Sequence, residues 1–240
     1  MDFTELSPRA TARVAGACYL VTIVAGLLAQ GVLSEQLIVG GDAAATAANI
    51  LSHASRFRVG FATYLVEMAA QIAMTVLLYE LFKPVSRRLS LLSAVFGLTG
   101  CAIKIIARLF YYAPLLVLSG MPYLDSFKRE QLDSLALLFL QINDQGAAIA
   151  LLFFGFGTLL KGYLVLRSTF LPRFLGVLAI AGGLGWLTFL WPPLGRQLFL
   201  YVAAVGLFGS LATIGWFLVV GVDEERWRAQ ASAAQRSIWR

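Results

Sequence analysis

Six long apolar segments dominate the chain. They cover residues 14–33, 59–82, 89–118, 134–160, 174–191 and 197–220. A helix rises about 1.5 Å per residue, so roughly 20 apolar residues cross the hydrocarbon core of a bilayer. The segments are continuous and rich in Leu and Ala, without the short alternating pattern of barrel strands. The pattern predicts an all-α membrane protein, a bundle of six transmembrane helices.

Composition agrees with this interpretation. The 240 residues are 59% hydrophobic and only 13% charged, with a mean hydropathy of +0.79, whereas soluble domains carry about 25% charged residues. Two cysteines are too few for a disulfide scaffold, and such hydrophobicity excludes a disordered chain. We therefore expect residues 1–240 to form a single membrane domain.

The positions of Lys and Arg predict how the chain is threaded. With the N-terminus inside, twelve basic residues lie on the cytoplasmic side: Arg9, Arg13, Lys83, Arg87, Arg88, Lys161, Arg167, Arg173, Arg226, Arg228, Arg236 and Arg240. Five lie outside: Arg56, Arg58, Lys128, Arg129 and Arg196. The positive-inside rule then places both termini in the cytoplasm. The net charge of +6 follows from this topology, so the expected partners of the basic loops are anionic membrane lipids and not nucleic acid.

Two segments outside the spans have an interfacial character. Residues 41–58, between the first and second spans, begin with the helix-capping residue Asp42 and predict a short external helix. The tail, residues 223–240, mixes tryptophans with arginines. It is equally consistent with an amphipathic helix on the inner leaflet and with a solvated end.

Four ionisable residues interrupt the apolar spans. They are Glu67 in the second span, Lys104 and Arg108 in the third, and Asp144 in the fourth. Each costs about 2.5–3.5 kcal/mol at the bilayer centre if it is left unpaired. Two acids and two bases permit neutral pairing, and counting residues from the span ends places all four at similar depths.

Polar residues at helical spacing extend this set. Tyr64, Glu67 and Gln71 recur every three or four residues and share one helix face, as do Lys104 and Arg108. The fourth span adds Gln141, Asn143 and Asp144. We expect these eight residues to form one intramembrane polar site, in which the two bases attract an anionic group. The alternative is a buried ion-pair network that only fixes helix register.

The residue inventory removes several kinds of chemistry. The only histidine, His53, lies outside the spans, which excludes bis-histidine haem, histidine-rich zinc and Ser–His hydrolase sites inside the membrane. The sequence has no phosphate-binding glycine loop. We expect no cofactor, no metal and no catalytic residues. Lys104 could act as a desolvated nucleophile, but neighbouring carboxylates oppose that role.

Several strings of the chain carry a family resemblance. They are Leu152-Phe153-Phe154-Gly155, Lys161-Gly162-Tyr163-Leu164, Arg167-Ser168, the string of residues 171–178, and residues 40–50 and 57–61. Over nearly its whole length the chain resembles a bacterial family of integral membrane proteins known as domain of unknown function 4386. The resemblance implies a multi-pass protein of the bacterial cytoplasmic (inner) membrane. It implies no established reaction and no catalytic residues.

Three functions are consistent with these observations. The first is binding or transport of a small polar or anionic solute, or of a lipid headgroup, at the intramembrane polar site. The second is a non-catalytic structural or regulatory role, in which the ion pairs serve folding only. The third is an intramembrane lipid-modifying enzyme, which the absence of a nucleophile–base pair disfavours.

Overall fold

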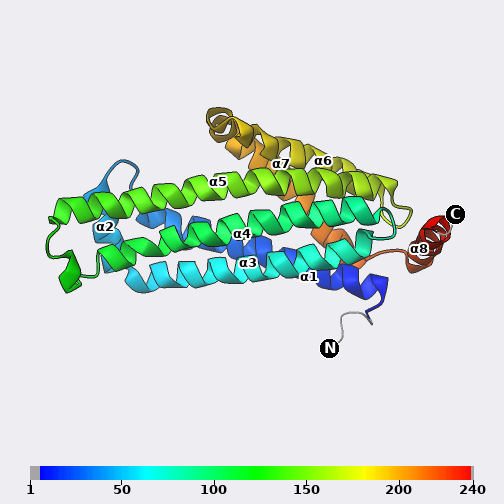
Figure 1. The fold of residues 1–240 in the computed structure, drawn as a ribbon, viewed down its shortest axis with the longest axis horizontal. Helices are drawn as coiled ribbons and strands as arrows, with labels where there is room; N and C mark the ends of the chain where they lie inside the picture. Colours follow the sequence, from blue (N-terminus) through cyan, green and yellow to red (C-terminus); the bar gives the residue numbers. More distant parts are fainter. Residues whose placement is uncertain (1–5, 239–240) are drawn as a thin grey trace. The chain divides into compact units, whose positions relative to one another are not determined.

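The computed structural model describes residues 6–238 and is helical throughout its regular elements. The α-helices are α1 (Pro8–Leu27), α2 (Ala43–Ser52), α3 (Ala54–Phe82), α4 (Arg87–Val117), α5 (Arg129–Arg167), α6 (Arg173–Leu187), α7 (Pro192–Val219) and α8 (Glu224–Ile238) (Figure 1). A π-helical turn, η2 (Leu28–Ser34), continues α1. Within the described part of the chain, six helices are long and apolar enough to cross a membrane. The predicted all-α fold with six spans is confirmed.

Contacts divide the chain into two compact units. The first unit comprises Met1–Leu20, Ala70–Cys101 and Ile149–Arg240, and the second comprises Val21–Ala69 and Ala102–Ala148. Each unit has its own apolar core. In the first unit Met74, Leu81, Leu164 and Phe217 are buried together. In the second unit Ala29, Ile50, Phe57 and Leu140 are buried together.

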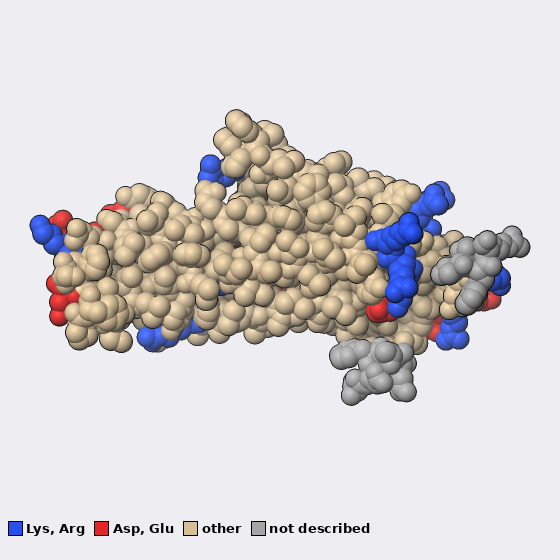
Figure 2. Space-filling view, viewed as in Figure 1, with Lys and Arg blue, Asp and Glu red and all other residues tan. Residues whose placement is uncertain are grey.

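The Lys and Arg residues predicted to lie on the two sides of the membrane fall largely into different units. Of the twelve residues predicted to be cytoplasmic, Arg240 lies outside the described residues and the other eleven belong to the first unit. Four of the five predicted outer residues belong to the second unit, and Arg196 belongs to the first. Figure 2 shows Lys and Arg gathered near α8, and a broad uncharged surface along the helices. The orientation of the termini stays a prediction.

Helix α2 begins where the sequence predicts it. The Asp42 carboxylate accepts a hydrogen bond from the backbone N–H of Ala45 at 2.9 Å, which caps the first turn. Ala47 and Ile50 on its inner face are fully buried in the core of the second unit. The segment is therefore a packed helix, and its location on the outer side of the membrane stays a prediction.

Helices α5 and α6 meet through glycines in the first unit. A Cβ atom added at Gly162 would lie 2.8 Å from the carbonyl oxygen of Gly176 and 2.9 Å from the backbone nitrogen of Ile180. Backbone atoms cannot move aside as a flexible side chain can, so only glycine permits this approach.

The close contact at Gly162 predicts that alanine lowers the stability at this position but not at Gly215. Gly162→Ala should lower the free energy of unfolding by about 1–3 kcal/mol, because the methyl group overpacks a backbone contact. Gly215→Ala is the matched control, since nothing lies within 4 Å of a Cβ atom there. The control should show no loss, because alanine favours a helix over glycine by up to about 1 kcal/mol. Unfolding by SDS titration in mixed micelles measures both. Equal stability of the two variants would refute the close contact.

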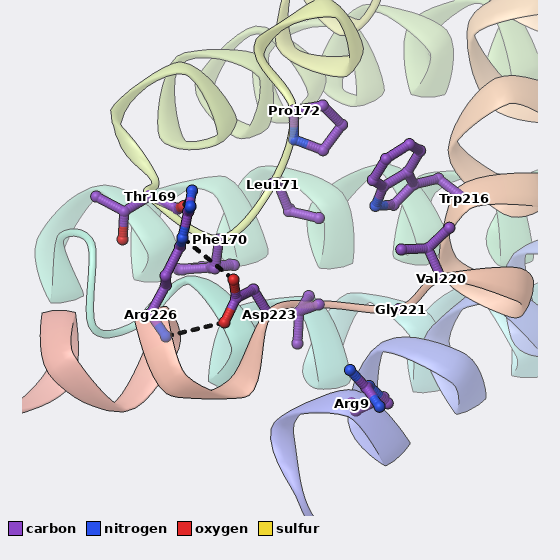
Figure 3. A pocket seen from close by; sticks show the side chains of 11 residues that line it. Arg9, Thr169, Phe170, Leu171, Pro172, Trp216, Val220, Gly221, Asp223 and Arg226 are labelled. Atoms are coloured by element: carbon purple, nitrogen blue, oxygen red, sulfur yellow. Dashed lines mark hydrogen bonds and ion pairs between the residues drawn. The ribbon is translucent and has the colours of Figure 1, made fainter.

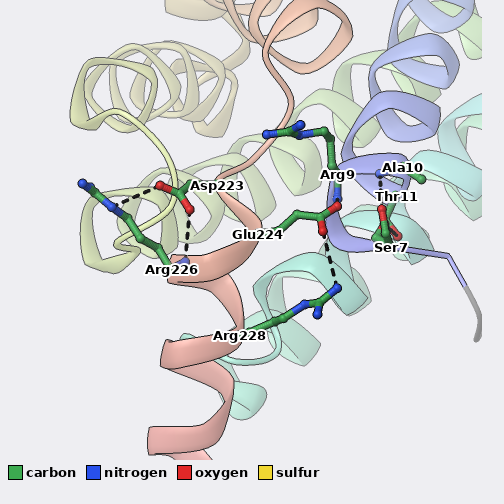
Figure 4. A network of polar contacts seen from close by, with 8 residues as sticks. All are labelled: Ser7, Arg9, Ala10, Thr11, Asp223, Glu224, Arg226 and Arg228. Atoms are coloured by element: carbon green, nitrogen blue, oxygen red, sulfur yellow. Dashed lines mark hydrogen bonds and ion pairs between the residues drawn. The ribbon is translucent and has the colours of Figure 1, made fainter.

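Hydrogen bonds hold the C-terminal helix α8 against the rest of the first unit. The Trp227 indole N–H donates to the carbonyl of Leu81 at 2.9 Å, and the side chain of Gln230 accepts from the backbone N–H and the hydroxyl of Thr169, both at 3.0 Å. Glu224 accepts from the backbone N–H of Arg9 at 3.3 Å (Figure 4). Residues 239–240 of the predicted tail lie outside the described residues, but residues 224–238 are a docked helix.

The docking of α8 against the first unit should depend on pH. The hydroxyl of Ser7 donates to the Glu224 carboxylate and, with the Arg9 N–H and the Arg228 guanidinium, holds the pKa of Glu224 below its ordinary value. A carboxylate with a lowered folded pKa contributes stability above its unfolded pKa of about 4.3, and loses it as the pH falls through the folded pKa. The difference in Tm between the wild type and Glu224→Gln should therefore be present at about pH 6 and shrink by about pH 3. A difference independent of pH would contradict this linkage.

Candidate functional site

A buried ion pair joins α3 and α4 in the second unit. The Nζ atom of Lys104 lies 2.5 Å from Oε1 of Glu67, and the side chains are 16% and 6% exposed, respectively. Gly26 on α1 faces the same carboxylate, because a Cβ atom there would lie 3.2 Å from Glu67 Oε1. The other carboxylate oxygen, Oε2, is buried without a hydrogen-bond partner among the described residues. Glu67 is thus enclosed by helices and neutralised by one base.

Arg108 lies one helical turn beyond Lys104 and has different partners. Its guanidinium carbon lies 3.5 Å from the centroid of the Tyr64 ring, and its Nη1 donates to Oδ1 of Asn143 at 2.8 Å. The Asn143 amide in turn donates to Oδ1 of Asp144 at 3.0 Å. Tyr64 and Asn143 are both neutral, and the Asn143 amide links the guanidinium to the second acid.

Arg108 is also deeply buried. Its exposed fraction is 3%, and its Nε has no hydrogen-bond partner among residues 6–238. A cation–π contact with a desolvated arginine contributes about 2 kcal/mol, which is less than the desolvation of a lone guanidinium. The site thus holds a cationic group with an unused donor inside an apolar segment.

Helix spacing explains how these side chains meet. Tyr64 and Glu67 are three residues apart on α3, and Lys104 and Arg108 are four apart on α4, so each pair shares one helix face. Small residues then bring α5 close to α4. A Cβ atom at Gly146 would lie 2.6 Å from that of Ala107, and this approach carries Asn143 to Arg108.

The end of the first span adds further polar contacts. The hydroxyl of Tyr64 donates to Oε1 of Gln30 at 2.6 Å. The hydroxyls of Ser34 and Tyr111 are 2.7 Å apart, and the Tyr111 ring stacks on Phe57 at 4.3 Å between centroids. Gln30 and Ser34 both belong to the π-helical turn η2. Turns of this kind are rare in proteins and are frequent at functional sites.

The structure brings some of the eight predicted residues together and leaves others apart. Lys104 contacts Glu67, and Arg108 contacts Tyr64 and Asn143. Asp144 is exposed and is joined to the second group through Asn143. Gln141 is exposed on α5, and Gln71 is half-buried in the first unit. The expected pairing of a base with an acid is seen directly for Lys104 and Glu67. Gln30 and Ser34 were missed, although an amide inside the first apolar run is itself a polar signal.

The donor set of the site suits an anion and not a metal. Guanidinium, ammonium and amide groups donate hydrogen bonds to carboxylate or phosphate oxygens. Within the described part of the chain, no group of three or more His, Cys, Asp or Glu residues could hold a metal ion. Tyr64 also lies within Coulombic reach of Arg108, Glu67 and Asp144.

Fold and site together define a class, the multi-pass α-helical membrane protein with a buried polar network. The chain belongs to the family described as "Domain of unknown function (DUF4386)", whose family model matches residues 14–221. No curated protein and no solved structure matches the chain.

Proposed function

We propose that the second unit binds a small polar or anionic solute, or the headgroup of a lipid, with Arg108 as the anchoring cation. The observation that carries the proposal is the guanidinium itself. It is 3% exposed, contacts the neutral groups Tyr64 and Asn143, and has its Nε unpartnered among the described residues.

The two bases of the network differ in what they could do for a ligand. Lys104 is matched by Glu67 at 2.5 Å, so that pair is neutral and serves packing. Arg108 contacts the neutral groups Tyr64 and Asn143. An anionic group placed beside its Nε would gain a charge-assisted hydrogen bond in a segment of low dielectric. Intramembrane ionisable residues generally mark ligand or ion pathways.

The π-helical turn supports a ligand role over a purely structural one. A π-helix is energetically poorer than an α-helix and persists where its geometry is used. Here Leu28–Ser34 presents Gln30 to the hydroxyl of Tyr64, the same residue whose ring supports Arg108. The turn thus positions the aromatic platform of the site. Transport of the bound group, in a bacterial cytoplasmic membrane, is the corresponding proposal for the whole protein.

A folding-only network is the competing interpretation, and one experiment separates the two. Purified protein in detergent is screened by thermal unfolding against inorganic phosphate, acetate, lactate and glycerol 3-phosphate. Binding stabilises the folded state by RT ln(1 + [L]/Kd), which is about 2.7 kcal/mol at a hundredfold excess over Kd. We expect at least one anion to raise the Tm of the wild type saturably and to leave Arg108→Gln unchanged. Identical shifts in both proteins would reject the site.

A further inference from the structure

A second candidate site lies in the first unit, at the junction of α1, α7 and α8. A cavity of about 460 Å³ opens there, between the N-terminal turn of α1, the loop of residues 168–172, the end of α7 and the start of α8 (Figure 3). This volume is within the usual range of ligand pockets. The cavity shares no residue with the polar network of the second unit.

Two arginines from different helices line the cavity. Arg9 comes from α1 and Arg226 from α8, and Figure 3 shows them on different sides of the chain segment that contains Gly221. Arg226 is oriented by Asp223, whose Oδ2 lies 3.1 Å from its Nε. Arg9 also attracts the Glu224 carboxylate, which is not part of the lining. With Asp223 included, the lining carries a net charge of +1.

Trp216 adds an aromatic ring to the lining. The ring is fixed by an edge contact with Phe174, at 5.9 Å between centroids. Its Nε1 atom is enclosed, and no acceptor contacts it in the described part of the chain. The ring, and not its N–H, therefore contributes to the surface of the cavity.

Gly221 leaves room for Arg9 to approach the cavity. Its φ of +75° is disfavoured for residues with a side chain, and a Cβ atom there would lie 2.9 Å from Cγ of Arg9. The glycine both ends α7 and leaves space for the Arg9 stem. Apolar residues, including Leu171, Pro172 and Val220, form much of the remaining lining.

We propose that this cavity binds the phosphodiester group of an anionic membrane lipid. Guanidinium groups match phosphate oxygens in a fork geometry. One net positive charge complements the single negative charge of a phosphodiester. The apolar lining suits the glycerol and first acyl carbons of a lipid, and the cavity lies where a spanning helix ends and a polar helix begins. Juxtamembrane arginines of this kind recognise lipid headgroups.

Native mass spectrometry of delipidated protein in detergent tests the proposal. The probes are short-chain phosphatidylglycerol, the corresponding phosphatidylcholine, and sodium phosphate. We expect phosphatidylglycerol to bind best, and Arg9→Gln and Arg226→Gln each to weaken it about tenfold or more. Arg88→Gln is the matched control, an exposed basic residue of the same unit outside the cavity. It should leave binding unchanged.

Two further variants distinguish a change in the cavity from a loss of the fold. Trp216→Phe keeps an aromatic ring in the lining but makes it smaller, and it should weaken phosphatidylglycerol binding less than either arginine variant does. Asp223→Asn keeps an oxygen to accept from the N–H of Arg226 and should tighten binding, because the cavity becomes more positive. Equal weakening by Arg88→Gln, or binding of phosphate without binding of lipid, would overturn the assignment.

Discussion

Replacing Lys104 with methionine is expected to lower the free energy of unfolding by about 3–5 kcal/mol. The substitution keeps most of the length of the side chain but leaves Glu67, which is 5% exposed, without the ammonium that lies 2.5 Å from its carboxylate. One carboxylate oxygen already lacks a hydrogen-bond partner among the described residues. The variant therefore leaves a buried carboxylate without its ion-pair partner in an apolar segment.

A double substitution distinguishes the loss of the ion pair from a loss of packing. Glu67→Leu with Lys104→Met removes both charges, and replacing a buried ion pair by apolar residues of similar volume is often neutral or stabilising. We expect the double variant to recover most of the stability that Lys104→Met loses, as measured by SDS titration in mixed micelles. A double variant as unstable as the single one would show that the ion pair is not the reason.

Arg108 should behave differently, with its largest effect on binding. Arg108→Lys keeps the positive charge but loses the planar guanidinium that stacks on Tyr64 at 3.5 Å and reaches Asn143 at 2.8 Å. We expect this variant to bind the stabilising anion about tenfold or more weakly than the wild type, and Arg108→Gln to show no saturable response. Equilibrium titrations followed by thermal unfolding measure both affinities.

The control for Arg108 lies in the same unit. Arg129 pairs with Asp133 at 3.0 Å, but its side chain is 55% exposed. An exposed pair of this kind contributes little to stability. Arg129→Gln should therefore keep the anion response of the wild type. If it lost the response as Arg108→Gln does, the effect would reflect overall charge and not the buried site.

The spans could be predicted from the sequence because length and hydropathy decide them. An apolar run of about 20 residues has few alternatives to crossing a membrane, and Lys83-Pro84 and Leu171-Pro172 mark breaks by their backbone chemistry alone. The same holds for the cap at Asp42, where one side chain and its near neighbours settle the start of α2. These features depend on local sequence.

The pairing inside the site depends on helix rotation and contact, which local sequence does not fix. Residue spacing placed Lys104 and Arg108 on one face of α4, but it did not show that Lys104 takes the acid and Arg108 the amide. The π-helical turn at Gln30 changes the phase of the first span and has no hydropathy pattern. The cavity beside Trp216 combines residues from distant parts of the chain, so no local motif reveals it.

The most direct measurement is an experimental density map of the protein purified with its native lipids and solutes. We predict non-protein density within hydrogen-bonding distance of Arg108 Nε, beside the face of α4 that Tyr64 and Asn143 cover. A well-resolved map in which that nitrogen meets only hydrocarbon side chains, with the network closed and dry, would contradict the proposed binding site and leave the network a folding element.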